Sequence, residues 1–162
     1  MKATPVILLT IGMVTAFGQW AVAQDAAKTP DQYSPADLTA LEKTLGQKTD
    51  ATGTATETLK KYASDYTMLA FRNKSGKAEL HEKFADFYFV VDGQATLVSG
   101  GQMVNGKPTA AGEVRGDSIT DGKETKLKKG DIVHIPANIP HQLLLANGDS
   151  FQYFIIKVQE VN

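Results

Sequence analysis

Two short stretches carry most of the side chains that could do chemistry. In the first, AELHEKFADFYFVVDG (residues 78–93), a single histidine, His81, stands among acidic residues that include Glu79 and Asp86. Glu79 and His81 are two positions apart, so in a β-strand they share one face. Carboxylate and imidazole groups gathered on one face are typical metal ligands. The same stretch is also consistent with an ordinary strand that has a charged rim.

The second stretch is GDIVHIPANIPH (residues 130–141), which ends in a histidine. Pro136 and Pro140 bracket a rigid corner, because each fixes its own φ angle, and His141 follows at once. A side chain held on a strand just after such a corner has little freedom, which suits a metal ligand. The simpler interpretation is a histidine with an ordinary structural role.

Composition excludes several other kinds of site. The chain has 162 residues, a formal net charge of −1 and no cysteine. Its length predicts one domain. The absence of cysteine excludes disulfides, thiolate metal sites and cysteine nucleophiles. The near-neutral charge lacks the basic patch that nucleic-acid binding requires, and neither a nucleophile motif nor a phosphate-binding glycine loop is present.

Residues 1–23 have the pattern of a cleaved signal peptide. A positively charged start precedes a short apolar core (residues 6–14), and small residues stand at Ala21 and Ala23. We expect cleavage after Ala23 and a periplasmic or secreted mature protein. A membrane anchor is the alternative, but Gly18 interrupts the apolar run before it reaches the ~20 residues that a spanning helix needs.

Residues 24–64 are predicted to form a leader, an amphipathic helix and a linker. Ser34 is a typical N-cap, Pro35 a typical first helical residue, and leucines recur at helical spacing before Gly46. Residues 49–58 are rich in Thr, Ala and Gly and predict a linker, with a short helical segment around residues 57–62.

Residues 65–162 are predicted to be an all-β domain. Short runs of β-branched and aromatic residues alternate with glycine-containing turns, without the strand–helix alternation of parallel sheets, which favours a sandwich or barrel. Asp92-Gly93 predicts a hairpin turn between strands at residues 87–91 and 94–99. Residues 103–122 predict a long connection with one or two short strands.

The second stretch resembles the second motif of the cupin family, Gly-(x)5-Pro-x-Gly-(x)2-His. Gly130, Pro136, Asn138 and His141 occupy the motif positions. The one departure is Asn138 in place of glycine, and asparagine also tolerates the left-handed conformation.

The first stretch resembles the first cupin motif, His-x-His-(x)3–4-Glu-(x)6-Gly, in one of two alignments. With His81 as the first histidine, Lys83 takes the second position and too few residues precede Asp86. With His81 as the second histidine, Glu79 takes the first position and Asp86 takes the Glu position. The spacing from His81 to Asp86 and the spacing from Asp86 to Gly93 then both fit the motif. We prefer the second alignment.

This resemblance implies a cupin-type jelly-roll β-barrel with a short N-terminal α-helix and a divalent metal ion in the barrel. The implied ligands are Glu79, His81, Asp86 and His141. Two imidazoles and two carboxylates favour Fe, Mn or Zn over copper. If Glu79 does not bind the ion, it could instead act as a catalytic general base.

Four other side chains are candidates for binding a substrate, each with a simpler structural alternative. Arg115 could hold an anionic group in a bidentate contact, and Gln142 could hydrogen-bond near the mouth of the pocket. His134 could be a partner of the ligands or a pocket base. Tyr88 lies on a strand one face of which could line the pocket.

The sequence therefore predicts an exported cupin that acts on or senses a small molecule, as a non-haem metalloenzyme such as a dioxygenase or isomerase. The alternative is a non-catalytic small-molecule-binding module in which the metal is lost or structural. A homodimer is expected, as cupins are commonly dimeric, and no nucleic-acid partner or membrane contact after cleavage.

Overall fold

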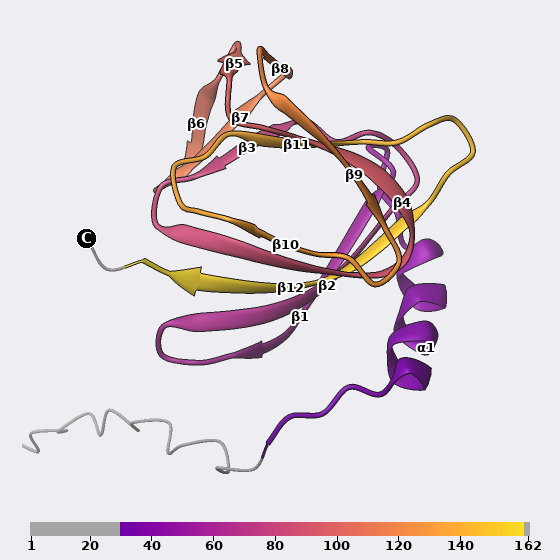
Figure 1. The fold of residues 1–162 in the computed structure, drawn as a ribbon. Coiled ribbons are helices and arrows are strands. Elements are labelled where there is room, and N and C mark those ends of the chain that lie inside the picture. Colours follow the sequence, from indigo (N-terminus) through magenta and orange to yellow (C-terminus); the bar gives the residue numbers. More distant parts are fainter. Residues whose placement is uncertain (1–29, 161–162) are drawn as a thin grey trace, which may run out of the picture. The chain divides into compact units, whose positions relative to one another are not determined.

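The computed structural model describes residues 30–160, and the described chain from Tyr33 on belongs to one compact unit. Within it lie one helix and twelve strands (Figure 1). The predicted signal peptide lies outside the described residues. No helix within residues 30–160 has the length and apolar character needed to cross a membrane. The elements are α1 (Pro35–Gly46), β1 (Thr54–Lys61), β2 (Asp65–Arg72), β3 (Ala78–His81), β4 (Phe84–Ser99), β5 (Gln102–Val104), β6 (Lys107–Ala110), β7 (Glu113–Gly116), β8 (Ser118–Thr120), β9 (Lys123–Lys128), β10 (Ile132–Ile135), β11 (His141–Leu144) and β12 (Phe151–Gln159).

Helix α1 begins where the sequence predicted. The Ser34 hydroxyl accepts a hydrogen bond from the Asp37 backbone N–H at 3.2 Å, and the Asp37 carboxylate accepts one from the Ser34 N–H at 2.9 Å. This reciprocal pair is a capping box, which satisfies two N–H groups that the first turn leaves free. At the other end Leu45 is buried with Ala55 of β1 and Leu69 of β2. Tertiary packing therefore stabilises a helix too short to persist alone.

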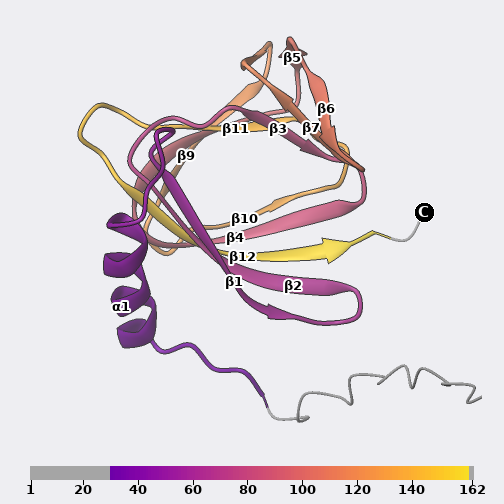
Figure 2. The same ribbon diagram turned by 180° about the vertical axis from the view of Figure 1, so that it is seen from behind.

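The strands form a curled antiparallel sheet in the order β1-β2-β12-β4-β11-β3-β7-β6, and β9 and β10 also pair with β4 (Figures 1 and 2). A separate two-stranded sheet joins β5 to β8. The first half of β4 pairs with β10 and β12, whereas its second half pairs with β9 and β11. Strand β4 therefore belongs to both walls of the barrel and holds them together.

The inward faces of these strands form the main core. Side chains there come from alternate positions of the strands, as expected for one buried sheet face. The buried members are Ala70, Tyr88, Val90, Ala95, Leu97, Leu127, Ile135, Leu143, Phe151, Tyr153 and Ile155.

The predicted hairpin at Asp92-Gly93 was wrong, because β4 continues through both residues without turning back. Gly93 has a φ of 78° and pairs with Phe151, and the register to β12 shifts just beyond, between Gln152 and Tyr153. A Cβ on Gly93 would collide with the Ser150 carbonyl. The glycine therefore serves a bulge that bends one long strand, a use of Asp-Gly that local sequence does not separate from a turn.

The linker and short helix predicted across residues 49–62 were also wrong in part. Residues 54–61 form β1, which pairs antiparallel with β2 in the main sheet. The threonines in this segment suit a strand. Because β1 lies at the edge of the sheet and much of it is exposed, its sequence lacks a clear alternation of apolar and polar residues. Pairing with β2, rather than local propensity, decides its conformation.

The proline corner between β10 and β11 is fastened to the end of β3. Asn138 has a φ of 63°, the left-handed conformation that the cupin resemblance implied for this position. Its backbone N–H donates to the His81 carbonyl at 2.8 Å, and its side-chain amide donates to the Glu82 carbonyl at 3.1 Å. The corner that carries His141 is thereby held against the strand that carries His81.

Asn138→Ala should lower the free energy of unfolding by about 1–2 kcal/mol, because alanine is strained at a positive φ and lacks the amide. Asn138→Gly should lose less, since glycine adopts this conformation freely. Asn147→Ala, in the exposed β11–β12 connection, is the control. Urea denaturation of the three variants measures these differences, and equal stability of Asn138→Ala and the wild type would contradict the role of the corner.

Candidate metal centre

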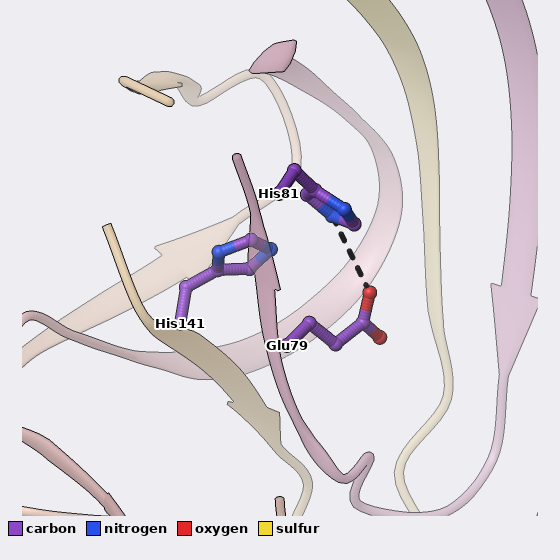
Figure 3. Close-up of side chains that lie close together, drawn as sticks. All are labelled: Glu79, His81 and His141. Atoms are coloured by element: carbon purple, nitrogen blue, oxygen red, sulfur yellow. Dashed lines mark ion pairs between the residues drawn. The ribbon is translucent and has the colours of Figure 1, made fainter. Parts of the chain in front are cut away.

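Three side chains from two neighbouring strands come together in the barrel (Figure 3). Strand β3 carries Glu79 and His81, and β11 carries His141 in register opposite Glu79. Directly paired residues of antiparallel strands project to the same side. One ligand atom from each of the three lies within 4.8 Å of the others, a spacing that could hold a metal ion.

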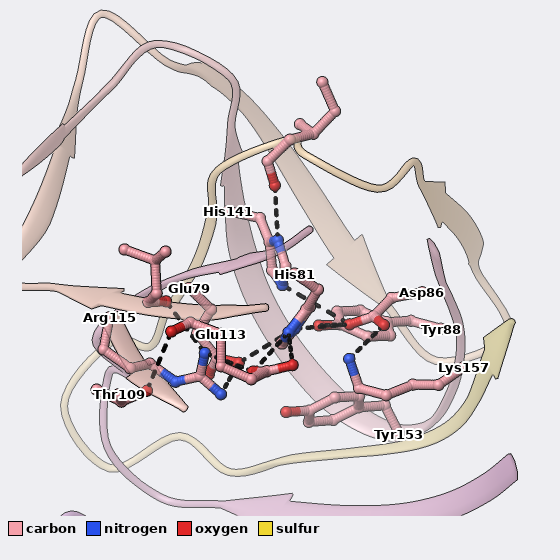
Figure 4. Close-up of polar contacts among 12 residues, drawn as sticks. Glu79, His81, Asp86, Tyr88, Thr109, Glu113, Arg115, His141, Tyr153 and Lys157 are labelled. Atoms are coloured by element: carbon pink, nitrogen blue, oxygen red, sulfur yellow. Dashed lines mark hydrogen bonds and ion pairs between the residues drawn. The ribbon is translucent and has the colours of Figure 1, made fainter. Parts of the chain in front are cut away.

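Both histidines turn Nε2 toward this space. His81 Nδ1 lies 2.8 Å from the Glu113 carboxylate, and His141 Nδ1 lies 3.0 Å from the Ile139 carbonyl (Figure 4). A carboxylate and a carbonyl only accept hydrogen bonds, so each Nδ1 must donate. In the neutral imidazoles the proton is then absent from Nε2. Burial lowers the pKa of His141, which favours that neutral form.

The two Nε2 atoms are buried and have no hydrogen-bond partner within the described residues. His81 Nε2 lies 3.6 Å from Glu79 Oε2 and 3.4 Å from Asp86 Oδ2, and His141 Nε2 lies 3.7 Å from the same Asp86 oxygen. With both imidazoles neutral, four acceptor atoms with lone pairs face one another in a largely buried space. A cation among them would satisfy all four, so the residues present fit a divalent metal ion.

Asp86 is also held by a buried ammonium group. Lys157 of β12 is paired in register with Asp86 of β4, and its Nζ lies 2.5 Å from Asp86 Oδ1. The Tyr88 hydroxyl donates to Asp86 Oδ2 at 3.2 Å. Burial alone would raise the pKa of Asp86, but His81 and Lys157 outweigh it and lower the pKa to about 2. Asp86 is therefore ionised, with one oxygen on Lys157 and the other toward the imidazoles.

Arginine side chains surround Glu79 and Glu113. Arg115 pairs in register with Glu79; its Nη2 lies 3.5 Å from Glu79 Oε2, and its Nη1 donates to Glu113 at 2.9 Å. Arg72 Nη2 lies 4.0 Å from Glu79 Oε1. The side chains of Glu79 and Arg115 are 28% and 33% exposed, whereas that of His81 is only 4% exposed. The two histidines and the charged side chains around them form one cluster. This cluster meets solvent on its Glu79 and Arg115 side.

The structure brings some of the predicted site residues together and leaves others apart. Glu79, His81, Asp86 and His141 converge, with Tyr88 and Arg115 in contact with them. Gln142 is buried away from the cluster, where its amide donates to the Gly76 carbonyl at 2.8 Å. His134 lies on the exposed outer side of β10 with its ring stacked on Phe87 at 4.3 Å, so it is not placed as a pocket base.

Sequence reasoning missed Glu113, Arg72 and Lys157. Arg72 and Lys157 did carry a signal, because each continues the inward-facing alternation of an apolar strand, Met68-Ala70-Arg72 in one case and Tyr153-Ile155-Lys157 in the other. A charged residue at a core position of a strand needs a partner. Glu113 carried no local signal, because only the pairing of β3 with β7 sets it opposite His81.

Lys157→Met should lower the free energy of unfolding of the metal-free protein by about 3 kcal/mol at pH 7, because it leaves Asp86 buried without its cation. The stability that a lowered carboxyl pKa provides is present above the ordinary value near 4 and is lost as pH falls through about 2. The difference between variant and wild type should therefore shrink between pH 4 and pH 2. Urea denaturation across this range measures it.

Lys129→Met is the matched control, since Lys129 pairs with Asp92 at 3.1 Å on the exposed surface, where an ion pair contributes little. Equal losses in the two variants would contradict a special role for Lys157.

Comparison of the sequence with protein-family models and with curated proteins finds no match. Several solved structures are similar. The protein TT1209 from Thermus thermophilus is 14% identical, with a TM-score of 0.52 over 72% of this chain and 92% of that one. A conserved protein with a double-stranded β-helix domain from Klebsiella pneumoniae is 14% identical, with a TM-score of 0.50 over 67% of this chain and 79% of that one.

The polyketide cyclase RemF from Streptomyces resistomycificus is 16% identical, with a TM-score of 0.49 over 67% of this chain, which spans 66% of RemF, just under two thirds. At such identities the likeness bears on the fold alone. Together with the curled antiparallel sheet, the likeness to TT1209 and to the Klebsiella protein confirms the predicted architecture. The chain has the double-stranded β-helix fold of the cupins.

Proposed function

We propose that this protein binds a divalent metal ion through Glu79, His81 and His141 and there acts on or senses a small molecule. The observation that carries the proposal is the pair of buried Nε2 atoms, both without a hydrogen-bond partner in the described chain and both facing carboxylate oxygens. Each imidazole is oriented by an acceptor at Nδ1, the arrangement that metal-ligating histidines use.

The ligand set suggests the kind of metal and leaves room for a substrate. Two imidazoles and one carboxylate suit Fe(II), Mn(II) or Zn(II), and three protein ligands leave coordination positions open. Asp86 stays a predicted fourth ligand, through the oxygen that faces the imidazoles. A bound ion would supply a Lewis acid for an oxygen atom of the small molecule. A dioxygenase-type or isomerase-type metalloenzyme is the finer form of this proposal.

The other side chains have roles that follow from their contacts. Glu113 holds a proton of His81 on Nδ1, Lys157 favours the ionised form of Asp86, and the Tyr88 hydroxyl helps to orient that carboxylate. Glu79, the most exposed of the three proposed ligands, could move a proton to or from a bound molecule if it leaves the ion.

Lys157 also favours a second candidate, a barrel that binds a small molecule without a metal. Its ammonium group already gives Asp86 a buried cation, so part of the charge that a metal would balance is balanced by the chain itself. In this case the imidazoles would act as hydrogen-bond acceptors for the ligand. Metal stoichiometry separates the two candidates.

The purified protein should bind close to one equivalent of Fe(II), Mn(II) or Zn(II), measured by elemental analysis after reconstitution and removal of free metal. His81→Ala and His141→Ala should each weaken metal binding by about 100-fold or more, since each removes one of three ligands. Glu79→Gln should weaken it less, because an amide oxygen is a poorer ligand than a carboxylate.

His134→Ala is the control, because this histidine lies outside the cluster and its loss should leave the stoichiometry unchanged. Less than a tenth of an equivalent of any of these metals in the wild type would reject the metal centre and favour the second candidate.

A homodimer and export are further proposals. Ile132 on β10 is 64% exposed next to the Phe87–His134 stack, so this outer sheet face would gain from burial in a dimer. Ile132→Glu should convert a dimer to a monomer in light scattering at micromolar concentration. A monomeric wild-type protein would reject the proposed dimer.

Export rests on residues 1–23, and an exported protein whose N-terminal sequence starts elsewhere than Gln24 would reject the predicted cleavage site.

A further inference from the structure

One cation beside the proposed metal centre is poorly satisfied. Arg72, the last residue of β2, is only 5% exposed, so its guanidinium cannot rely on water. Nε and Nη2 both reach the same acceptor, the Tyr153 hydroxyl, at 3.4 Å, and Nη2 lies 4.0 Å from Glu79. Nη1 has no hydrogen-bond partner within residues 30–160. A guanidinium has five N–H donors, and few of them are used here.

The backbone makes room for this side chain. A Cβ on Gly76, in the connection between β2 and β3, would collide with Arg72 Nη1. Gly76 is itself held in place, because its N–H donates to the Leu143 carbonyl and its carbonyl accepts from Gln142. The space for the guanidinium beside Glu79 therefore depends on a glycine that is itself fixed by two hydrogen bonds.

The balance of charges in the cluster also indicates a ligand, and an anionic one. Glu79, Asp86 and Glu113 are in contact with Arg72, Arg115 and Lys157, and three negative charges balance three positive ones. A divalent ion at the proposed centre would leave two positive charges in excess in a partly buried space. An unbalanced buried charge is costly, so the metal-loaded centre favours an anionic ligand.

The chemistry of the site narrows the anion to a carboxylate. A planar carboxylate matches the guanidinium fork, and a monoanionic group loses less hydration on burial than a phosphate dianion. Resting on the proposed function, we infer that the ligand of the metal centre is a small carboxylic acid whose carboxylate is bound by Arg72. Arg115, predicted from the sequence for that role, is instead engaged by Glu113 and Glu79.

The test uses the purified protein loaded with Co(II), whose visible absorption reports ligands near the metal, together with calorimetry. Acetate and succinate are the probes, and succinamide is the uncharged counterpart of succinate. Wild-type protein should bind succinate at least tenfold more tightly than succinamide. Arg72→Met should weaken succinate binding by about 10- to 100-fold with the cobalt content unchanged, as expected for the loss of charge-assisted hydrogen bonds. Arg72→Lys should retain part of the affinity.

Two further variants separate position from charge. Gly76→Ala keeps the charge of Arg72 but fills its space, and it should weaken succinate binding severalfold. Lys126→Met removes one positive charge from β9, where the lysine bonds to Thr96 outside the cluster, and should change the affinity less than twofold. Thermal unfolding and cobalt content of every variant check that it is folded and loaded.

The outcomes distinguish the two proposals. A wild-type protein that binds no cobalt overturns the metal centre and this inference with it. A cobalt-loaded protein that binds neither acetate nor succinate, or binds succinamide equally well, overturns the inference alone. Unchanged succinate affinity in folded, cobalt-loaded Arg72→Met also overturns it. If Arg72→Met is unfolded, Arg72→Lys and Gly76→Ala decide in its place, and unchanged affinity in both overturns the inference.

Discussion

The Nε2 atoms of His81 and His141 and two carboxylate oxygens face one another in a largely buried space, and much of the surrounding structure serves to hold them there. Acceptor atoms of this kind repel one another unless a cation or a proton lies between them. Glu113 and the Ile139 carbonyl keep the protons on the far nitrogens of His81 and His141. The Asn138 corner keeps the two strands from separating.

Strand pairing does most of this positioning. His141 opposes Glu79, Glu113 opposes His81, Arg115 opposes Glu79, and Lys157 opposes Asp86, each as a directly paired couple of antiparallel strands. A shift of one residue in any of these registers would turn a charged side chain to the other face of the sheet. The bulge at Gly93 matters for the same reason, because it corrects the register of β12 before Lys157 reaches Asp86.

The charged side chains of the cluster also differ in how deeply they are buried. Asp86, Lys157 and the histidines are nearly inaccessible, whereas Glu79, Glu113 and Arg115 are about a quarter to a third exposed. The inner groups define a fixed environment for an ion, and the outer ones border the route to solvent. Arg72 is the exception, a buried cation beside Glu79 with few partners, and this is why it is the group that points to a ligand.

Sequence reasoning found the parts of the site that depend on local geometry. Two-residue alternation places Glu79 with His81, the proline corner singles out His141, and Ser34 followed by Pro35 marks the start of α1, because each follows from a few consecutive residues. It failed at Asp92-Gly93 and at residues 54–61, where the same local signals serve a bulge and an outer strand. At those points the long-range pairing with β12 and β2 decides the conformation.

The sequence by itself determined an all-β chain with one capped helix, and it identified the four side chains that converge in the barrel. Only the tertiary structure decided which partners complete them. Glu113 and Lys157 meet the cluster through the register of paired strands, which sets them opposite His81 and Asp86, and Arg72 reaches it through its side chain, beside Glu79. It also removed His134 and Gln142 from the site, because the face that each strand turns inward depends on the sheet it joins.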